Sequence, residues 1–292
     1  MSERALVLGG GGSAGNAWLV GVVAGLADAG TDSTAADRVI GTSAGATAAV
    51  QVTGAQPGAL LAEILSTEVP RRPPVPAEGN PDRTPHRPAV DHLERTGRII
   101  AAASDAADMR RRMGAAALER DAADPGKPRW RDVVASRLPS QQWPRQRVLI
   151  TAVDAHTGEP VVFDRHSGID LVDAVAASTS ALTPYRIGEK RYLNGGYRRS
   201  ENADLAMGFG RVVVLSPFSG RTRMPLEWGM DLATQVDELR AVGSRVEAVF
   251  PDSGAGDVFD ANALDPSTRR QAARGGYEQG QALAERLADF WS

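Results

Sequence analysis

One serine of the sequence stands between glycines in a pattern that could make it a nucleophile. Gly41-Thr42-Ser43-Ala44-Gly45 fits G-x-S-x-G, in which a sharp strand-to-helix turn lifts the central hydroxyl clear of the sheet. The flanking glycines are needed because a side chain would clash in so tight a turn. The motif therefore predicts acyl transfer at Ser43, with a Gly/Ser turn around an inert serine as the alternative.

A second glycine-rich stretch, residues 10–15, precedes this turn and fits G-x-G-x-x-G. In a dinucleotide site an acidic residue stands near the end of the second strand. Here that strand ends in the serine turn, and Asp37 precedes it. Consecutive glycines leave N–H groups bare at a helix N-terminus, where they form a cradle for negative charge. We expect the stretch to stabilise an oxyanion, with a nucleotide site as the alternative.

Alternating strands and helices are needed to position the two stretches. Buried strands are expected over four apolar runs, residues 4–8, 37–40, 147–153 and 211–215. Residues 14–29 carry apolar side chains at helical spacing, and residues 46–52 are small and apolar, as a buried helix would be. Strand, turn and helix in repetition predict an α/β fold with a mainly parallel sheet.

The composition changes after Val69. Seven prolines stand between residues 70 and 88, which predicts a long exposed loop. Residues 90–123 are helical in pattern and rich in Ala and Arg. We expect residues 70–145 to form a cap inserted into one domain that spans residues 1–292. Its Met109 and Met113 would either pack against the core or form an apolar wall at a pocket mouth.

The glycine stretch 10–15, the serine turn 41–45 and the segment Tyr192-Leu-Asn-Gly-Gly196 together resemble the patatin-like phospholipases. That resemblance covers residues 4–53 and 147–216 and leaves out the cap. It implies a three-layer α/β/α fold, a Ser–Asp dyad in place of a triad, an acyl-ester or lipid substrate and no cofactor. The segment 177–184 resembles a family segment that precedes the third motif, and we expect it to line the acyl pocket.

By position, the resemblance makes Ser43 the nucleophile and the loop Gly10, Gly11 and Gly12 the oxyanion hole, with N–H donors from Gly11 and Gly12. Gly41 and Gly45 shape the serine turn. The dyad partner falls at position 194, where the family has Asp and this chain has Asn194.

A neutral amide at position 194 cannot take the serine proton. Losing such a group lowers rates by about 10⁴-fold while oxyanion and binding contributions remain. Asn194 is either an inactivating substitution, which the intact surroundings favour, or a natural departure from the family mechanism.

The remaining candidates for chemistry are weaker. His86, His92, His156 and His166 could complete a Ser-His-Asp triad, but the last lies at position 166 of 292, and surface or loop positions are the simpler interpretation. Asp154 begins a turn-forming segment. The run 110–112, Arg-Arg-Arg, could meet phosphate or an anionic surface, or form a solvated helix face.

Composition excludes several classes of function. The net charge of −3 and pI of about 5.9 argue against a nucleic-acid binder but leave transient contact with a lipid surface open. Zero cysteines exclude disulfides and thiolate metal sites, and no residue cluster has metal-ligand spacing. No run approaches the roughly 20 apolar residues of a membrane span, and the first residues do not resemble a secretory signal. A cytoplasmic location is the default expectation, and the oligomeric state stays open.

The sequence thus predicts a lipase- or phospholipase-type hydrolase of carboxylic esters that works through an acyl-enzyme on Ser43 and is impaired by Asn194. Two alternatives remain. One is an acyltransferase or specialised-metabolite hydrolase that uses the same acyl-enzyme. The other is a pseudoenzyme that binds acyl ligands without turning them over.

Overall fold

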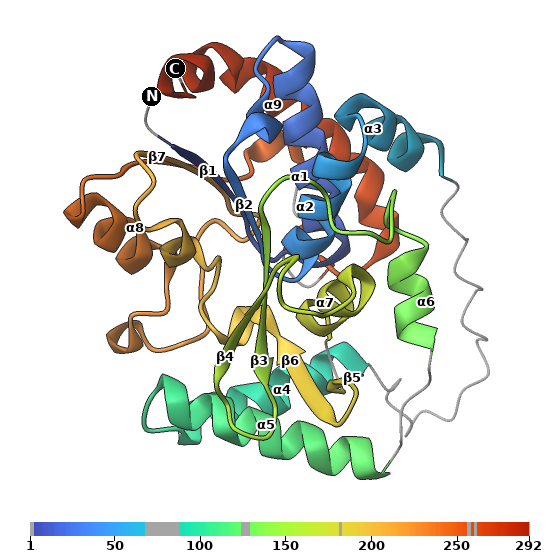
Figure 1. The fold of residues 1–292 in the computed structure, drawn as a ribbon, viewed down its shortest axis with the longest axis vertical. Coiled ribbons are helices and arrows are strands. Elements are labelled where there is room, and N and C mark those ends of the chain that lie inside the picture. The colour runs from blue at the N-terminus through green and yellow to red at the C-terminus, as the bar shows by residue number, and fades with distance from the viewer. Residues whose placement is uncertain are drawn as a thin grey trace, which may run out of the picture.

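The computed structural model describes residues 3–67, 88–123, 129–180, 183–255, 258–259 and 262–291. Within these ranges one sheet of eight strands forms the centre of the molecule, in the order β5-β6-β3-β2-β1-β7-β8 with β4 beside β3 (Figure 1). The strands are β1 (Arg4–Leu8), β2 (Arg38–Gly41), β3 (Val148–Asp154), β4 (Pro160–Phe163), β5 (Tyr185–Ile187), β6 (Lys190–Asn194), β7 (Arg211–Leu215) and β8 (Arg245–Val249).

The sheet is parallel from β3 through β2, β1 and β7 to β8, and antiparallel where β4 and β6 flank β3 and β5 pairs with β6. The longer helices are α1 (Gly12–Asp28), α2 (Ala44–Gly54), α3 (Pro57–Ser66), α4 (Pro88–Ala102), α5 (Ala106–Ala123), α6 (Arg129–Ala135), α7 (Leu171–Ser178), α8 (Leu232–Ala241) and α9 (Arg269–Trp291). Single 3₁₀ turns are η1 (Ser33–Ala35), η2 (Gly195–Tyr197), η3 (Ala203–Ala206), η4 (Leu226–Trp228), η5 (Ser253–Ala255) and η6 (Pro266–Thr268).

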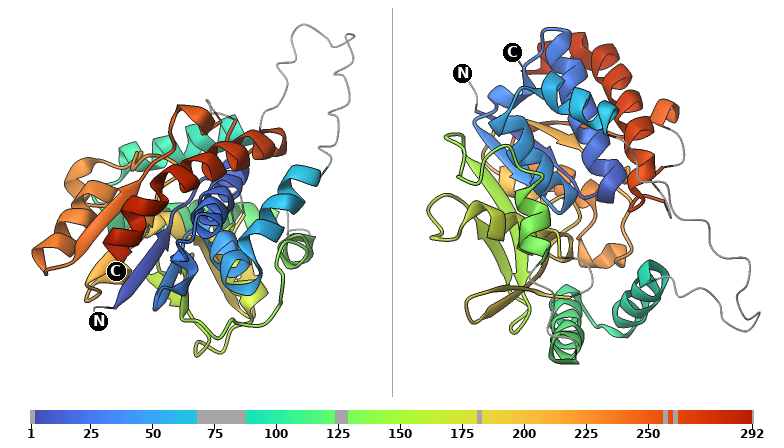
Figure 2. Two further views of the ribbon diagram at one scale, coloured as in Figure 1. Left: turned by 90° about the horizontal axis from the view of Figure 1, so that it is seen from above. Right: turned by 90° about the vertical axis from the view of Figure 1, so that its right-hand side faces the viewer.

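Alternate residues of the parallel strands face opposite sides of the sheet, and each side has its own helices. Leu6 and Leu8 of β1 pack in a core with α1, α2, α7 and α9, whereas Ala5 and Val7 pack with Leu239 of α8 on the other face. Because both faces are covered, β1 and β7 are continuous apolar runs. The predicted three-layer α/β/α fold with a mainly parallel sheet is confirmed (Figure 2).

Helix α1 begins at the glycine stretch, and α9 holds it in place. The two helices approach so closely that a Cβ on Gly25 would lie 2.1 Å from the carbonyl oxygen of Tyr277, and one on Gly280 would lie 2.3 Å from that of Val22. The indole N–H of Trp18 also donates to Gln279 across the interface, at 2.9 Å. The middle and second half of α1 are therefore packed closely against α9.

The region expected to be a cap contains α4, α5 and α6, while residues 70–87 of the proline-rich loop expected over 70–88 lie outside the described residues. Helices α4 and α5 lie at one end of the molecule beside β3, β4 and β6 (Figure 1). Ile100 of α4 and Met109 and Met113 of α5 form an apolar cluster with Val153 of β3 and Leu193 of β6. In the described ranges no helix is both long and apolar enough to cross a bilayer.

Strand register brings three loops to one edge of the sheet. Leu8 at the end of β1 lies opposite Gly41 of β2 and Leu215 of β7, so these parallel strands end together. Strand β3 continues past β2, since Gly41 pairs with Ile150 and the next residues of β3 pair with β6. The antiparallel β6 ends at Asn194 opposite Ala152, which places this residue just beyond the end of β2.

Candidate active site

Ser43 occupies the sharp turn between β2 and α2 in a strained conformation. Its φ of 54° and ψ of −119° lie in a region that residues other than glycine rarely adopt. A Cβ on Gly41 would lie 2.6 Å from the Cα of Ala46, and one on Gly45 would lie 1.9 Å from the carbonyl oxygen of Leu8. The turn therefore requires both glycines of the motif, and it is built as a nucleophile turn is built.

Asn194 lies within hydrogen-bond distance of Ser43. Its Nδ2 donates to Ser43 Oγ at 3.0 Å, and its Oδ1 accepts from the N–H of Gly196 at 2.9 Å. The backbone N–H decides the orientation of the amide, because only the oxygen can accept from it. The group that faces Ser43 is consequently a donor, and this side chain offers the serine proton no acceptor.

The glycine stretch lies against Ser43. A Cβ on Gly10 would lie 3.5 Å from Ser43 Cβ, and α1 begins at Gly12, whose φ is 63°. Over the described part of the chain, no protein group accepts a hydrogen bond from the N–H of Gly10, Gly11 or Gly12. These donors and the N-terminus of α1 form a positive cradle beside the serine hydroxyl.

Residues 177–180 form a further wall of the site. The N–H of Ser43 donates to Ser178 Oγ at 2.9 Å, and Ser178 is fully buried at the end of α7. Ser180 Oγ hydrogen-bonds to the carbonyl oxygens of Ala177 and Tyr192. The segment resembling the family pattern thus touches the nucleophile turn directly; its residues 181–182 lie outside the described part.

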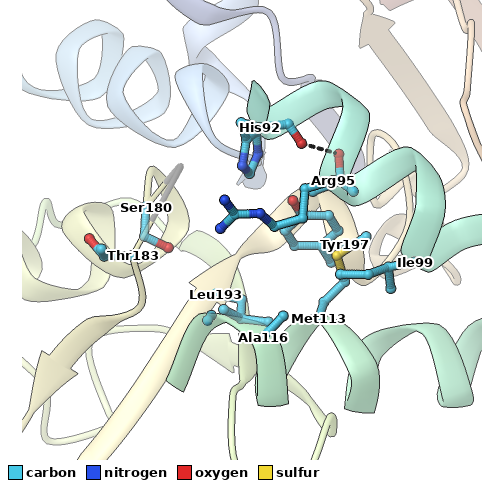
Figure 3. Close-up of a pocket in the computed structure, with 11 residues that line it drawn as sticks. His92, Arg95, Ile99, Met113, Ala116, Ser180, Thr183, Leu193 and Tyr197 are labelled. Carbon is cyan, nitrogen blue, oxygen red and sulfur yellow. Dashed lines mark hydrogen bonds between the residues drawn. The ribbon is translucent and has the colours of Figure 1, made fainter. Parts of the chain in front are cut away.

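A cavity of about 40 Å³ lies between helices α4 and α5 and strand β6, and its lining includes Leu193 but neither Asn194 nor Ser43 (Figure 3). Leu193 and Tyr197 come from the strand and turn that carry Asn194, and Met113 and Ile99 come from α5 and α4. The volume holds a few water molecules rather than a long acyl chain.

Two basic side chains, His92 and Arg95, line this cavity, and Arg223 lies near it. Figure 3 shows Arg95 lying between His92 and Tyr197. Arg223 donates to Thr96 Oγ1 at 2.8 Å, and neither arginine pairs with a carboxylate among the described side chains. Burial lowers the pKa of His92, and so do the nearby charges of Arg223, Arg120 and Arg95. An anionic group would therefore be favoured at this position.

The two methionines of α5 have different surroundings. Met109 is fully buried in the cluster with Val153 and Leu193, whereas Met113 is nearly buried but also lines the cavity. Met109 is thus a core residue rather than part of a pocket wall. Replacing it by a polar residue would destabilise the fold, so only Met113 can test a role of this helix in substrate choice.

The alternative site residues lie elsewhere. Asp37 accepts from the N–H of Arg4 at 2.7 Å, at the opposite edge of the sheet from the glycine stretch, so it cannot hold a ribose there. His92 lines the cavity, and His156 and His166 lie in turns capped by Asp154 and Asp164. His86 lies outside the described residues.

Each arginine of the run 110–112 has a partner within the chain, although Arg111 and Arg112 stay exposed on α5. Arg110 donates to the carbonyl oxygen of Gly158 at 2.9 Å, and Arg111 and Arg112 pair with Asp108. Among the residues that the structure describes, no three His, Cys, Asp or Glu side chains gather as metal ligands would.

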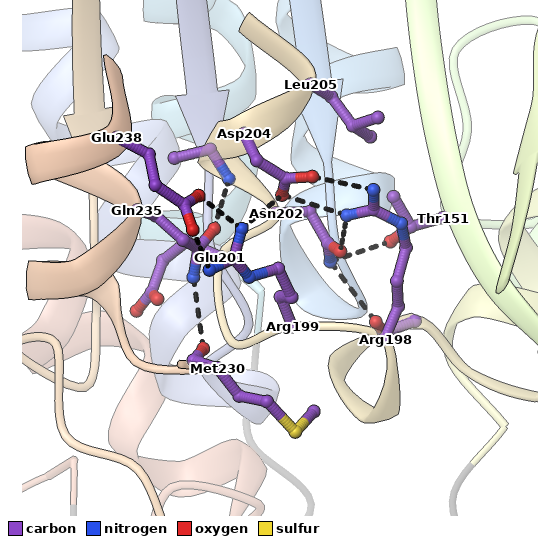
Figure 4. A network of polar contacts seen from close by, with 12 residues as sticks. Thr151, Arg198, Arg199, Glu201, Asn202, Asp204, Leu205, Met230, Gln235 and Glu238 are labelled. Atoms are coloured by element: carbon purple, nitrogen blue, oxygen red, sulfur yellow. Dashed lines mark hydrogen bonds and ion pairs between the residues drawn. The ribbon is translucent and has the colours of Figure 1, made fainter. Parts of the chain in front are cut away.

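Two buried polar residues near the site, Glu201 and Asn202, give no signal in the sequence, because a polar pair in a loop predicts solvent exposure (Figure 4). Glu201 is only 3% exposed. Its Oε1 accepts from Ser216 Oγ at 2.7 Å, whereas Oε2 makes no hydrogen bond of good geometry with a described group. Burial raises the pKa of this carboxyl, against the lowering effect of its hydroxyl partners.

Fold and site together define an α/β/α protein that carries a serine on a nucleophile-type turn beside a glycine-rich helix N-terminus. The model of the patatin-like phospholipase family matches residues 6–207. The chain belongs to this family of lipid acyl hydrolases.

Two solved structures show similarity in fold alone. VipD from Legionella pneumophila is 12% identical with a TM-score of 0.46, and the type III effector ExoU is 16% identical with a TM-score of 0.42. The comparisons cover 98% of this chain in both cases, but only 67% of the VipD chain and 53% of the ExoU chain. No curated protein sequence matches the chain significantly.

The buried carboxyl of Glu201 predicts a pH-dependent contribution to stability. Because its pKa lies above the ordinary value of 4.5, the folded state holds this proton more tightly than the unfolded chain does. The free energy of unfolding therefore falls as pH rises above about 4.5, and it stays lowered above the raised pKa. Glu201→Gln removes this loss. We therefore expect the Tm of the variant minus the Tm of the parent to increase from pH 4 to pH 8.

The exposed Glu285 on α9 provides the control, as Glu285→Gln should keep the same Tm difference across that range. A constant difference for Glu201→Gln as well would show that folding does not raise the pKa of Glu201.

Proposed function

We propose that this protein hydrolyses carboxylic esters of lipids through an acyl-enzyme on Ser43. The observation that carries the proposal is the strained turn that presents Ser43 Oγ to position 194 at 3.0 Å, between the bare N–H groups of the glycine stretch and the segment ending α7. Ser43 Oγ would bond to the acyl carbon, and the alcohol would leave with the serine proton. Water would then attack the acyl carbon, and the acid would leave as Ser43 Oγ takes back a proton.

The glycine stretch supplies the electrostatic part of this mechanism. In the tetrahedral intermediate the former carbonyl oxygen carries a negative charge, which donors at Gly10, Gly11 and Gly12 would stabilise. These N–H groups find no partner in the described protein, and the start of α1 adds its positive end. Removing one such donor in other enzymes costs about 10²–10³-fold in kcat.

Asn194 sets the limit on the rate. An aspartate there could accept from Gly196 N–H with one oxygen and from the Ser43 hydroxyl with the other. The amide keeps the first contact and replaces the second by a donor. The chain as it stands would therefore bind an ester and hold its oxyanion but lack the general base. This reversal of donor and acceptor also favours the second candidate function, a pseudoenzyme that binds acyl ligands.

Helices α4 and α5, within the proposed 70–145 cap, would contribute to substrate choice. They form one side of the cavity, and its other side is built from Leu193 and Tyr197 around position 194. Arg95 lines the cavity and Arg223 lies close enough to His92 to lower its pKa, and these two cations support a lipid ester that carries a negatively charged group and transient contact with a lipid surface. An acyltransferase would use the same acyl-enzyme with an alcohol in place of water.

Asn194→Asp should raise hydrolysis of a short-chain aryl ester by at least about 10²-fold, because it restores an acceptor for the Ser43 proton. The rate is measured by release of the aryl alcohol from purified proteins with matching circular dichroism. Gln142→Glu makes the same amide-to-carboxylate change at an exposed position far from Ser43 and should leave the rate unchanged. Equal rates for the parent and Asn194→Asp would refute the dyad.

Ser43→Ala in the Asn194→Asp background should abolish labelling by a fluorophosphonate probe, since only an activated serine reacts with it. Intact-mass and peptide mass spectrometry locate the label. Ser253→Ala, at an exposed serine of η5, should leave labelling intact. A label that persists on another serine after Ser43→Ala would overturn the assignment of the nucleophile.

Arg95→Gln in the Asn194→Asp background should lower kcat/KM about tenfold for an anionic lipid ester, and much less for a neutral ester with the same acyl chain. The reason is the loss of one charge-assisted hydrogen bond, worth roughly 1.5–3 kcal/mol. Arg98, exposed on the same helix but outside the cavity, is the matched control. Equal losses of kcat/KM for both esters would show that the cavity does not contribute to substrate choice.

A further inference from the structure

We propose that Asn202 is a positioning residue that holds the Ser43 turn and the position-194 turn at a fixed distance from each other. Its importance for the reaction rests on the proposed function, whereas its role as a connector stands on contacts alone. One amide group reaches both turns. Asn202 Nδ2 donates to Thr42 Oγ1 at 2.9 Å, directly before Ser43, and to the carbonyl oxygen of Gly195 at 3.1 Å, directly after Asn194.

The same amide also contacts β3, the strand that separates the two turns. Asn202 Nδ2 lies 3.2 Å from Thr151 Oγ1, and Thr151 Oγ1 lies 3.3 Å from Thr42 Oγ1. The Thr42 hydroxyl donates to the carbonyl oxygen of Glu201 at 3.1 Å, so it is an acceptor toward Asn202. Every hydroxyl of this group therefore has a defined direction, and the contacts support one another.

Arg198 fixes which end of the Asn202 amide faces the site. Its Nη1 donates to Asn202 Oδ1 at 2.7 Å, and its guanidinium forms a two-bond ion pair with Asp204, at 2.9 and 2.7 Å (Figure 4). With Oδ1 held by a cation, Nδ2 must point toward Thr42 and Gly195. A rotated amide would place two donors against each other.

The backbone of Asn202 also indicates a constrained position. Its φ of 60° and ψ of 34° are left-handed, and the residue is fully buried. Asparagine tolerates this conformation better than most residues, but a buried one persists only where the surroundings over-determine it. Here two of the contacts, with Thr42 and Gly195, lead to the turns that carry Ser43 and Asn194.

The relative position of the two turns matters because the reaction depends on the distance between Ser43 Oγ and position 194. That distance is 3.0 Å, and no covalent or secondary-structure link joins the two side chains. A displacement of about 1 Å at a reacting pair can lower the rate about 10²-fold. Loss of the Asn202 amide should therefore change catalysis more than it changes substrate binding.

The test compares Asn202→Gly with the Asn194→Asp parent. Glycine accepts the left-handed backbone and removes only the amide. We expect kcat to fall about 10- to 100-fold at unchanged KM. Gln279→Ala is the matched control: it removes a buried amide that joins α9 to Trp18 and Phe250, so it should lower Tm without lowering kcat.

A second measurement does not depend on turnover. In the chain with Asn194, Asn202→Gly should speed hydrogen exchange of the amides in residues 42–46 and 195–198, while Gln279→Ala leaves them unchanged. Faster exchange in a protein whose Asn194→Asp form shows no esterase activity would support the connector and refute the proposed function. Unchanged kcat, or unchanged exchange in both segments, would overturn the role of Asn202.

Should Asn202→Gly fail to fold, Thr151→Val removes the hydroxyl that lies 3.2 Å from Asn202 Nδ2 and donates to Thr42, while keeping the side-chain volume. We then expect a smaller fall in kcat, with the same faster exchange in residues 42–46 and 195–198. Parent-like kcat and exchange in that variant would count against the proposal.

Discussion

The hydrogen bond between Ser43 and Asn194 depends on strand register more than on any other feature of the molecule. Parallel strands β1 and β2 end together, which brings the glycine stretch beside the serine turn. Strand β3 runs further and pairs with the antiparallel β6, which returns position 194 to the same edge. A shift of β6 by one residue would turn Asn194 to the other face of the sheet. The buried contacts behind this edge keep that register in place.

Those contacts are polar, which is unusual for the centre of a fold and costly unless every group is paired. Thr42, Thr151 and Asn202 satisfy one another and two backbone carbonyl oxygens. Glu201 is the exception, because one carboxyl oxygen has no partner among the described groups. Its raised pKa means that the region is most stable with this side chain neutral. The rigid support of the site thus combines an ordered amide network with a buried acid.

Membership in the patatin-like phospholipase family indicates ester hydrolysis, whereas the amide at position 194 indicates a site without a general base. The strained turn and the glycine stretch fit acyl transfer, while Asn194 presents a donor where the reaction needs an acceptor. Because Gly196 orients the side chain, the same position could hold a carboxylate without other changes. The difference between a hydrolase and an acyl-binding protein is therefore concentrated in one atom of one side chain.

The sequence by itself determined the features that depend on local backbone chemistry. Glycines at positions 41 and 45 are required by the turn they flank, and apolar runs next to glycines predict buried strands, so Ser43, the glycine stretch and the α/β class follow from short segments. Only the tertiary structure decided that Met109 belongs to the core, that Arg95 lies at a cavity, and that Asn202 joins two turns. The physical reason is distance along the chain: Asn202 contacts a residue 160 positions away, and no local pattern distinguishes a buried polar residue with such partners from a solvated one.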